Sequence, residues 1–141
     1  VSGIHAPIKY TLHEKNLGNE SSAYTSSEPT NDPQWGLLSA INLSTGKIQW
    51  QYKTEQPLIG GTLTTKAGLV FVGEGNGNFN AIDASTGNLL WQTKGDAGVN
   101  APPISYMING EQYIAVAAGG NKIMGFTQGD FINVYKLPKV K

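Results

Sequence analysis

The sequence predicts an all-β fold made of repeated four-stranded antiparallel units. A hairpin-like stretch that begins at Gly36 begins again at Gly77, 41 residues later, and glycine-marked turns separate short apolar segments along most of the chain. A repeat of this length is the signature of a fold built from one recurring supersecondary unit. Helix has almost no support in the pattern.

The repeated element is a hairpin that ends on tryptophan. Gly36 to Trp50 reads GLLSAINLSTGKIQW and Gly77 to Trp91 reads GNFNAIDASTGNLLW, with seven of the fifteen positions identical. Each copy has an alternating apolar strand, an Asn or Asp followed by Ser-Thr-Gly, and a second strand. The two tryptophans are therefore expected at equivalent packing positions between neighbouring units, and cofactor stacking is the minority alternative.

The turn of each copy has its own side-chain chemistry. Gly46 and Gly87 are predicted to supply the positive φ of the turn. Asn42 and Asp83 are predicted to accept backbone N–H bonds across it, as Asx caps do. A catalytic role for the Asp83 carboxylate is the less favoured interpretation.

Further strands complete the units. Thr62 to Thr65 and Leu69 to Val72 predict a hairpin before the second copy, and the Asn109-Gly110 pair between apolar runs predicts a hairpin in the third unit. Residues 129–137 resemble the start of the repeated hairpin and then stop, so the last unit is expected to lack its fourth strand.

Four short strands per roughly 40 residues describe the blade of a β-propeller. A sandwich or a barrel does not predict a sequence repeat in register with the strand order. The predicted architecture is thus a partial propeller of about three blades, and propellers close with roughly 4 to 8. The remaining blades, or another protomer, are expected to finish the ring.

The N-terminal part has a different composition. Residues 1–33 contain a cluster of Ser, Thr, Asn and Pro and are predicted to be a loop-rich segment, with the partial propeller at residues 34–141. His5 and His13 have no third metal ligand at a suitable spacing, so ordinary solvated or packed histidines are expected there, with a zinc site as a remote alternative.

Composition excludes several classes of function. All ten basic residues are Lys and are balanced by ten acidic residues, which makes nucleic acid an unfavourable partner. The absence of Cys excludes disulfides, thiolate metal sites and a Cys nucleophile. No apolar run approaches the roughly 18 residues of a transmembrane segment, and the start at Val1 carries no signal-peptide pattern. A start at Val is compatible with processing, an expression boundary or a fragment.

Three further segments give the pattern a family resemblance. Pro57 to Gly73 reads PLIGGTLTTKAGLVFVG, Val99 to Tyr106 reads VNAPPISY, and Gly129 to Pro138 reads GDFINVYKLP. Together with the two tryptophan hairpins, in this order, they resemble the C-terminal part of a pyrroloquinoline quinone (PQQ) dependent alcohol or glucose dehydrogenase. The resemblance covers residues 34–138.

The resemblance implies an eight-bladed quinoprotein propeller with tryptophan-docking repeats. PQQ would lie on a calcium ion in the central channel, and alcohols or aldose sugars would pass a hydride equivalent to the quinone and onward to an electron acceptor. The family's Asp base and calcium ligands come from blades N-terminal to the matched region, so this chain is expected to contain no catalytic residue and no metal ligand and to be inactive alone. A periplasmic location follows from the resemblance only.

Two segments are candidates for contact with the cofactor, because loops that lead into a blade's innermost strand line the channel. They are Ile59-Gly60-Gly61 and Asn100-Ala101. Ile59 would pack on the quinone plane, and the Asn100 amide would donate to a quinone oxygen or a carboxylate. The simpler interpretation of Asn100 is a cap before the two prolines that follow.

Two other functions remain open from the sequence. One is a non-catalytic PQQ-like propeller that acts as a protein-interaction scaffold, as in outer-membrane assembly factors. The other is a short protein whose three-blade protomers assemble head to tail into a ring. A carboxylate-rich metal cluster upstream would favour the enzyme.

Overall fold

A computed structural model of the chain describes residues 1–17 and 20–138. These residues form strands, turns and loops, with no helix among them. The strands are β1 (Ser2–His5), β2 (Ile8–Leu17), β3 (Glu20–Pro29), β4 (Trp35–Ile41), β5 (Ile48–Thr54), β6 (Thr62–Thr64), β7 (Leu69–Gly73), β8 (Asn78–Asp83), β9 (Leu89–Lys94), β10 (Ile104–Ile108), β11 (Glu111–Ala118) and β12 (Phe131–Lys136).

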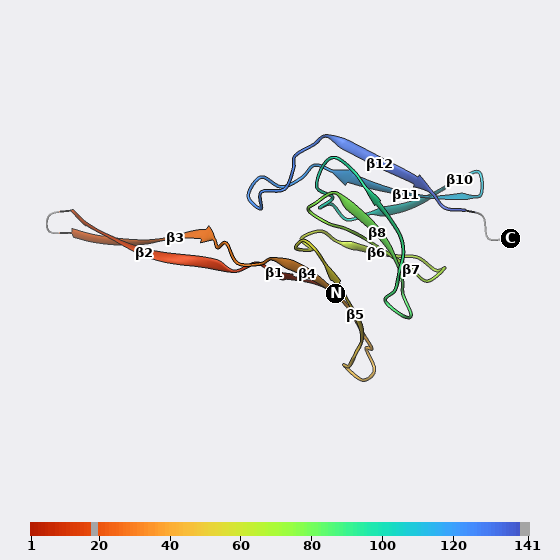
Figure 1. Ribbon diagram of the computed structural model, residues 1–141, viewed down its shortest axis with the longest axis horizontal. Helices are drawn as coiled ribbons and strands as arrows, with labels where there is room; N and C mark the ends of the chain where they lie inside the picture. The colour runs from red at the N-terminus through yellow and green to blue at the C-terminus, as the bar shows by residue number, and fades with distance from the viewer. Residues whose placement is uncertain (18–19, 139–141) are drawn as a thin grey trace.

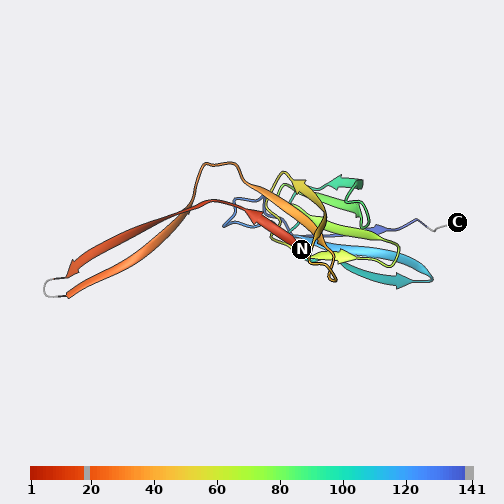
Figure 2. The ribbon, with the colours of Figure 1, turned by 90° about the horizontal axis from the view of Figure 1, so that it is seen from below.

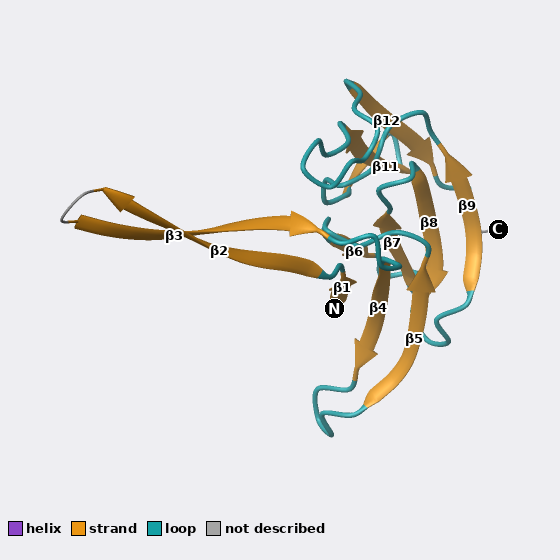
Figure 3. Cartoon of the chain, turned by 60° about the vertical axis from the view of Figure 1, so that its left-hand side comes forward, coloured by secondary structure: helices purple, strands orange, loops and turns teal. Residues whose placement is uncertain are grey.

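Three antiparallel sheets follow one another along the chain like the blades of a propeller. The first has the order β1-β4-β5, the second β6-β7-β8-β9 and the third β10-β11-β12. Figure 1 and Figure 3 show these sheets stacked side by side in an arc. The predicted all-β fold and partial propeller are confirmed, and the second sheet is a complete four-stranded blade.

The repeated hairpin is β4–β5 in the first sheet and β8–β9 in the second. Both hairpins have an irregularity at the same place, between Ala40 and Ile41 and between Ala81 and Ile82. The two turn glycines have the predicted positive φ, 67° and 77°. The sequence repeat is therefore a repeat of backbone geometry as well.

The third sheet also follows the prediction. Asn109 and Gly110 form the two-residue turn between β10 and β11, with φ of 50° and 74°. β12 then pairs with β11 and has no further strand beside it among the described residues. The third sheet thus has three strands, whereas the second sheet has four.

The loop predicted for residues 1–33 is wrong for most of that segment. β1 pairs with β4 and belongs to the first sheet, while β2 and β3 form a long two-stranded hairpin, which we call the arm. Figure 2 shows the arm extending away from the sheets. Its Ser- and Thr-rich second strand suggests a loop by composition, yet Ile8, Tyr10 and Leu12 alternate with polar residues in the first half of β2, which is the period of a strand.

Two apolar cores hold the three sheets together. Between the first and second sheets lie Leu38, Leu58, Val70, Val72 and Ile82. Between the second and third sheets lie Phe71, Phe79, Ala81, Ala97, Val99, Ile114, Val116 and Ala118. Since β7 contributes to both cores, the centre of the second sheet is buried on both faces, and β7 itself is a nearly continuous apolar run.

Candidate functional site

The strand order brings the connections between sheets to one edge of the stack. Each sheet ends on an outer strand, and the chain then crosses to the inner strand of the next sheet, through residues 55–61 and 95–103. Because neighbouring strands are antiparallel, the β7–β8 turn, the β11–β12 loop and the base of the arm emerge at this same edge. We call it the connection edge.

The two predicted site segments meet at the connection edge. A methyl group added at Gly60 would lie 2.8 Å from the carbonyl oxygen of Asn100, and one added at Gly61 would lie 2.7 Å from Cβ of Pro102. Only glycine allows the two connections to approach so closely. Ile59 and Ala101 flank this contact, and both are partly exposed.

Asn100 has an unusual side chain. Its Oδ1 and Nδ2 are both shielded from solvent, and neither has a hydrogen-bond partner among the described residues. A buried amide without partners is costly, at about 1–3 kcal/mol, and most such groups in native proteins are satisfied. The capping role that the sequence offered for Asn100 is therefore not what this side chain does. Its amide is able to donate to one ligand atom and accept from another.

A buried carboxylate ties the two connections to the second sheet. Glu74 is 2% exposed, and its side chain accepts hydrogen bonds from the Glu55 backbone N–H at 3.1 Å and from Asn80 Nδ2 at 2.7 Å. Its backbone carbonyl accepts from the Val99 N–H at 2.9 Å. One residue thus holds the start of the first connection and the middle of the second. Sequence reasoning missed Glu74, although an acidic residue inside the glycine-rich β7–β8 turn was a usable signal.

The β11–β12 loop closes over the same place. Phe126 covers Gly75, where an added methyl group would clash with its ring. Gly98 donates its N–H to the Thr127 carbonyl at 2.9 Å and accepts from the Gly120 N–H at 2.9 Å. The connection that carries Asn100 is therefore fixed on both sides by backbone hydrogen bonds.

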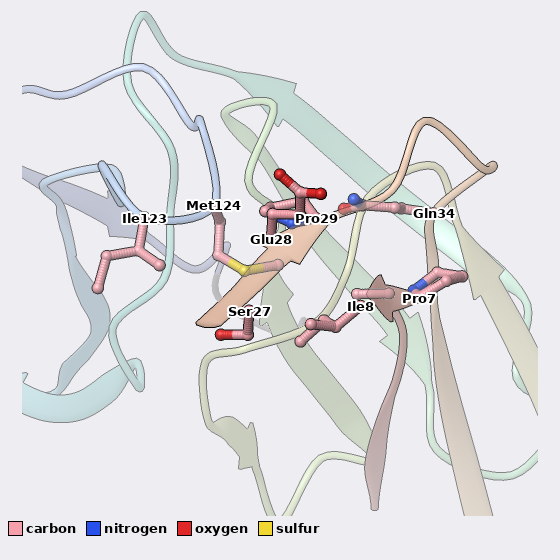
Figure 4. Close-up of a pocket in the computed structure, with 9 residues that line it drawn as sticks. Pro7, Ile8, Ser27, Glu28, Pro29, Gln34, Ile123 and Met124 are labelled. Carbon is pink, nitrogen blue, oxygen red and sulfur yellow. The ribbon is translucent and has the colours of Figure 1, made fainter. Parts of the chain in front are cut away.

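A small pocket of about 160 Å³ lies where the base of the arm faces the β11–β12 loop (Figure 4). Figure 4 shows Met124 and Ile123 on one side and Pro7 and Ile8 on the other. Its remaining lining residues are Ala6, Ser27, Glu28, Pro29 and Gln34. None of the residues predicted from the sequence lines this pocket, because the prediction of a loop for residues 1–33 gave no reason to place that segment here.

A larger groove of about 510 Å³ runs beside β12, on the side of the sheets away from the connections. Trp91 forms part of it and is 42% exposed. The equivalent Trp50 is instead covered: its indole N–H donates to the Ala84 carbonyl at 2.9 Å, and its ring lies against Gly87 in the next turn. Trp50 thus contacts the next unit, whereas Trp91 lacks such a turn among the described residues, so the equivalence of the two packing positions stays a prediction.

Comparison with known proteins decides the family. The family model described as "PQQ: Glucose/ethanol/alcohol dehydrogenase, beta-propeller domain" matches residues 8–114. The chain belongs to this glucose/ethanol/alcohol dehydrogenase propeller family. The resemblance seen in the sequence is confirmed.

Curated relatives of the family include both alcohol and glucose dehydrogenases. The chain is 41% identical over 105 residues to the quinoprotein alcohol dehydrogenase PedE of Pseudomonas putida, covering 74% of this chain and 17% of that protein. It is 31% identical over 130 residues to the quinoprotein glucose dehydrogenase of Escherichia coli, covering 78% of this chain and 16% of that protein. The chain therefore spans about a sixth of the length of these two relatives.

Solved structures of the family share the fold. The quinohemoprotein alcohol dehydrogenase of Comamonas testosteroni superposes with a TM-score of 0.75 at 25% identity, over 99% of this chain and 25% of that one. A europium-containing methanol dehydrogenase gives a TM-score of 0.68 at 26% identity, over 85% of this chain and 22% of that one. The arc of three sheets is thus a propeller segment of the dehydrogenase type.

Other polar groups of this family member serve structure. His5 stacks on Trp35, and His13 stacks on Tyr24 in the arm. Asp83 caps its turn, as the sequence predicted. Within residues 1–17 and 20–138, no three His, Cys, Asp or Glu side chains gather into a possible metal site, and no helix is long and apolar enough to span a membrane.

Proposed function

We propose that this chain forms part of the propeller of a PQQ-dependent dehydrogenase that oxidises alcohols or aldose sugars. Membership in the family supports the reaction class, and the small share of the relatives' length supports the view that the catalytic base and metal ligands belong to other blades. The resemblance implies a periplasmic location, and we propose that location for this protein.

The observation that carries the proposal for this chain's own role is the unpartnered amide of Asn100. It lies where the two predicted segments meet, in the connections that lead into β6 and β10, the strands that we propose face the central channel. We assign the cofactor contact to Asn100 and Ala101 on one connection and to Ile59, Gly60 and Gly61 on the other.

The residues present fit such a ligand. The Asn100 amide would donate to a carboxylate or carbonyl oxygen of the cofactor, and Ile59 offers an apolar side chain for a flat ring. When bound, the quinone would accept the hydride equivalent released by the substrate. We assign no metal ligand to the described residues, and calcium remains the ion that the resemblance implies.

The test uses the natural polypeptide that carries this sequence, mixed with PQQ and either calcium or europium ions. Equilibrium dialysis measures PQQ binding, and reduction of an artificial acceptor is followed with alcohols and with aldoses. Binding and turnover with either substrate class are expected, and a protein that binds no PQQ with either ion contradicts the proposal.

Asn100→Leu separates a ligand contact from a structural role. It should weaken PQQ binding about tenfold, as expected for the loss of one or two hydrogen bonds. It should not lower the unfolding midpoint of the PQQ-free protein, because the amide it replaces has no partner to lose. Asn88→Leu, in an exposed turn, is the matched control and should leave PQQ affinity unchanged. A large loss of stability in Asn100→Leu with unchanged PQQ affinity would overturn the assignment of Asn100.

A further inference from the structure

The sequence contains two Asn-Gly pairs, Asn76-Gly77 and Asn109-Gly110. Asparagine is thermolabile in proteins, and glycine after it imposes the least steric hindrance to cyclisation. In this reaction the backbone nitrogen of the glycine attacks the Asn side-chain carbonyl, a cyclic imide forms and ammonia leaves. Water then opens the ring to aspartate or isoaspartate, so water is consumed and ammonia released with no change of oxidation state.

The pair at Asn109 is free to react. It forms the tip of the β10–β11 hairpin, and both residues are exposed. The Asn109 side chain makes no hydrogen bond with the described residues, and the Gly110 N–H, which is the attacking group, makes none with a backbone carbonyl. A methyl group added at Gly110 would meet nothing within 4 Å, so the turn has space to deform.

The pair at Asn76 is held by its surroundings. Asn76 Oδ1 accepts from the Asn78 N–H at 3.0 Å, and its Nδ2 donates to Glu55 Oε2 at 3.3 Å. The Gly77 N–H donates to the Glu74 carbonyl at 3.2 Å. Gly77 is buried, and its Cα faces the Gly95 carbonyl so closely that even a methyl group would not fit. Cyclisation at this pair requires several of these contacts to open first.

We propose that Asn109 is a site of non-enzymatic deamidation in the folded protein and that the fold protects Asn76 from the same reaction. At least two hydrogen bonds must break at Asn76 and none at Asn109, and each bond is worth a factor of about 5. Deamidation at Asn109 is therefore expected to be more than about tenfold faster.

The isoaspartate product has a structural consequence. It adds a side-chain carbon to the main chain, so the two-residue turn no longer matches the pairing of Ile108 with Glu111. β10 pairs only with β11 among the described strands. β10 therefore loosens first, and it is the strand that directly follows the connection carrying Asn100.

The test follows both asparagines in one sample. The purified protein is held folded at mildly alkaline pH, a second sample is held in urea, and peptide mass spectrometry with electron-transfer fragmentation measures aspartate and isoaspartate at each position. We expect conversion of Asn109 well before Asn76 in the folded sample and similar rates for the two in urea. Equal rates in the folded protein, or no conversion of Asn109 while the urea sample converts, would falsify the proposal.

The variant Asn109→Gln tests whether deamidation is what loosens β10. Asn109→Gln keeps the amide but requires a larger, less favourable ring for cyclisation, so it should stay unmodified in the folded sample. Amide hydrogen exchange in β10 should quicken with age in the original protein and stay constant in Asn109→Gln. Faster exchange in both proteins would show that ageing loosens β10 without deamidation and would overturn this consequence.

Discussion

Asn42 and Asp83 occupy equivalent positions in the two repeated hairpins and make the same hydrogen bonds with the backbone. Asn42 Oδ1 accepts the N–H groups of Ser44 and Thr45 at 2.9 and 3.1 Å. Asp83 Oδ1 accepts the equivalent N–H groups of Ser85 and Thr86 at 2.7 and 3.0 Å. These contacts span three residues or fewer, so the sequence was enough to predict them.

Only the second turn has a carboxylate, Asp83, where the first has Asn42. We therefore predict that the stability of the second turn, and not of the first, depends on pH. The Ser85 hydroxyl and the backbone N–H groups of Ser85 and Thr86 lower the pKa of Asp83 below its ordinary value. A carboxyl whose pKa is depressed by folding stabilises the fold at pH values above its unfolded pKa of about 3.9, and this contribution is lost as the pH falls through the lower folded value.

NMR titration should therefore show the amides of Ser85 and Thr86 shifting at acid pH, while those of Ser44 and Thr45 do not follow the same transition. Asp83→Asn converts the second turn into the chemistry of the first and should abolish the shift. Equal acid transitions at both turns would contradict the prediction.

At the level of elements, the sequence predicted the hairpins whose turns have a clear local signal and missed the arm, which has no buried face. The β4–β5, β8–β9 and β10–β11 hairpins carry Gly or Asn-Gly at their turns, and each was predicted. The arm was missed because no core imposes an apolar pattern on both of its strands. Tyr10 and Leu12 are 71% and 62% exposed, and polar residues face them across the arm. An isolated two-stranded hairpin is marginally stable in water.

A matched pair of substitutions tests whether the arm contributes to the stability of the sheets. Leu38 lies between the first and second sheets at 2% exposure, whereas Leu12 is 62% exposed on the arm. Leu38→Ala should cost about 2–5 kcal/mol in the free energy of unfolding. Leu12→Ala should change it by less than about 0.5 kcal/mol. Chemical denaturation measures both, and similar losses for the two variants would mean that the arm packs against the sheets in solution.

At the level of the whole molecule, the site depends on contacts that no local pattern encodes. The sequence predicted the segments at Ile59 and Asn100 separately, because each leads into an inner strand. It could not predict that Gly60 packs against the Asn100 backbone or that Glu74 ties both connections together, since these contacts depend on how successive sheets stack. The pocket at the base of the arm likewise joins residues near position 8 to residues near position 124.

The two tryptophans give a test of how the sheets are joined. Trp50 donates its indole N–H to Ala84 in the second sheet, while the indole N–H of Trp91 has no partner among the described residues. Trp91 makes edge contacts with the rings of Phe79 and Tyr135, at centroid distances of 6.5 and 5.3 Å. Phenylalanine keeps much of the ring packing and removes the donor, so the pair Trp50→Phe and Trp91→Phe isolates the hydrogen bond.

Trp50→Phe should therefore lower the free energy of unfolding by about 1 kcal/mol more than Trp91→Phe, which is the usual net worth of one hydrogen bond whose acceptor is left behind. Urea denaturation of the two variants measures the difference. Equal losses would mean that the Trp50 indole stabilises the contact between the first two sheets through ring packing and not through its hydrogen bond. A larger loss for Trp91→Phe would contradict the prediction. It would mean that the indole N–H of Trp91 also has a hydrogen-bond partner in solution, supplied by a segment that occupies the groove beside β12.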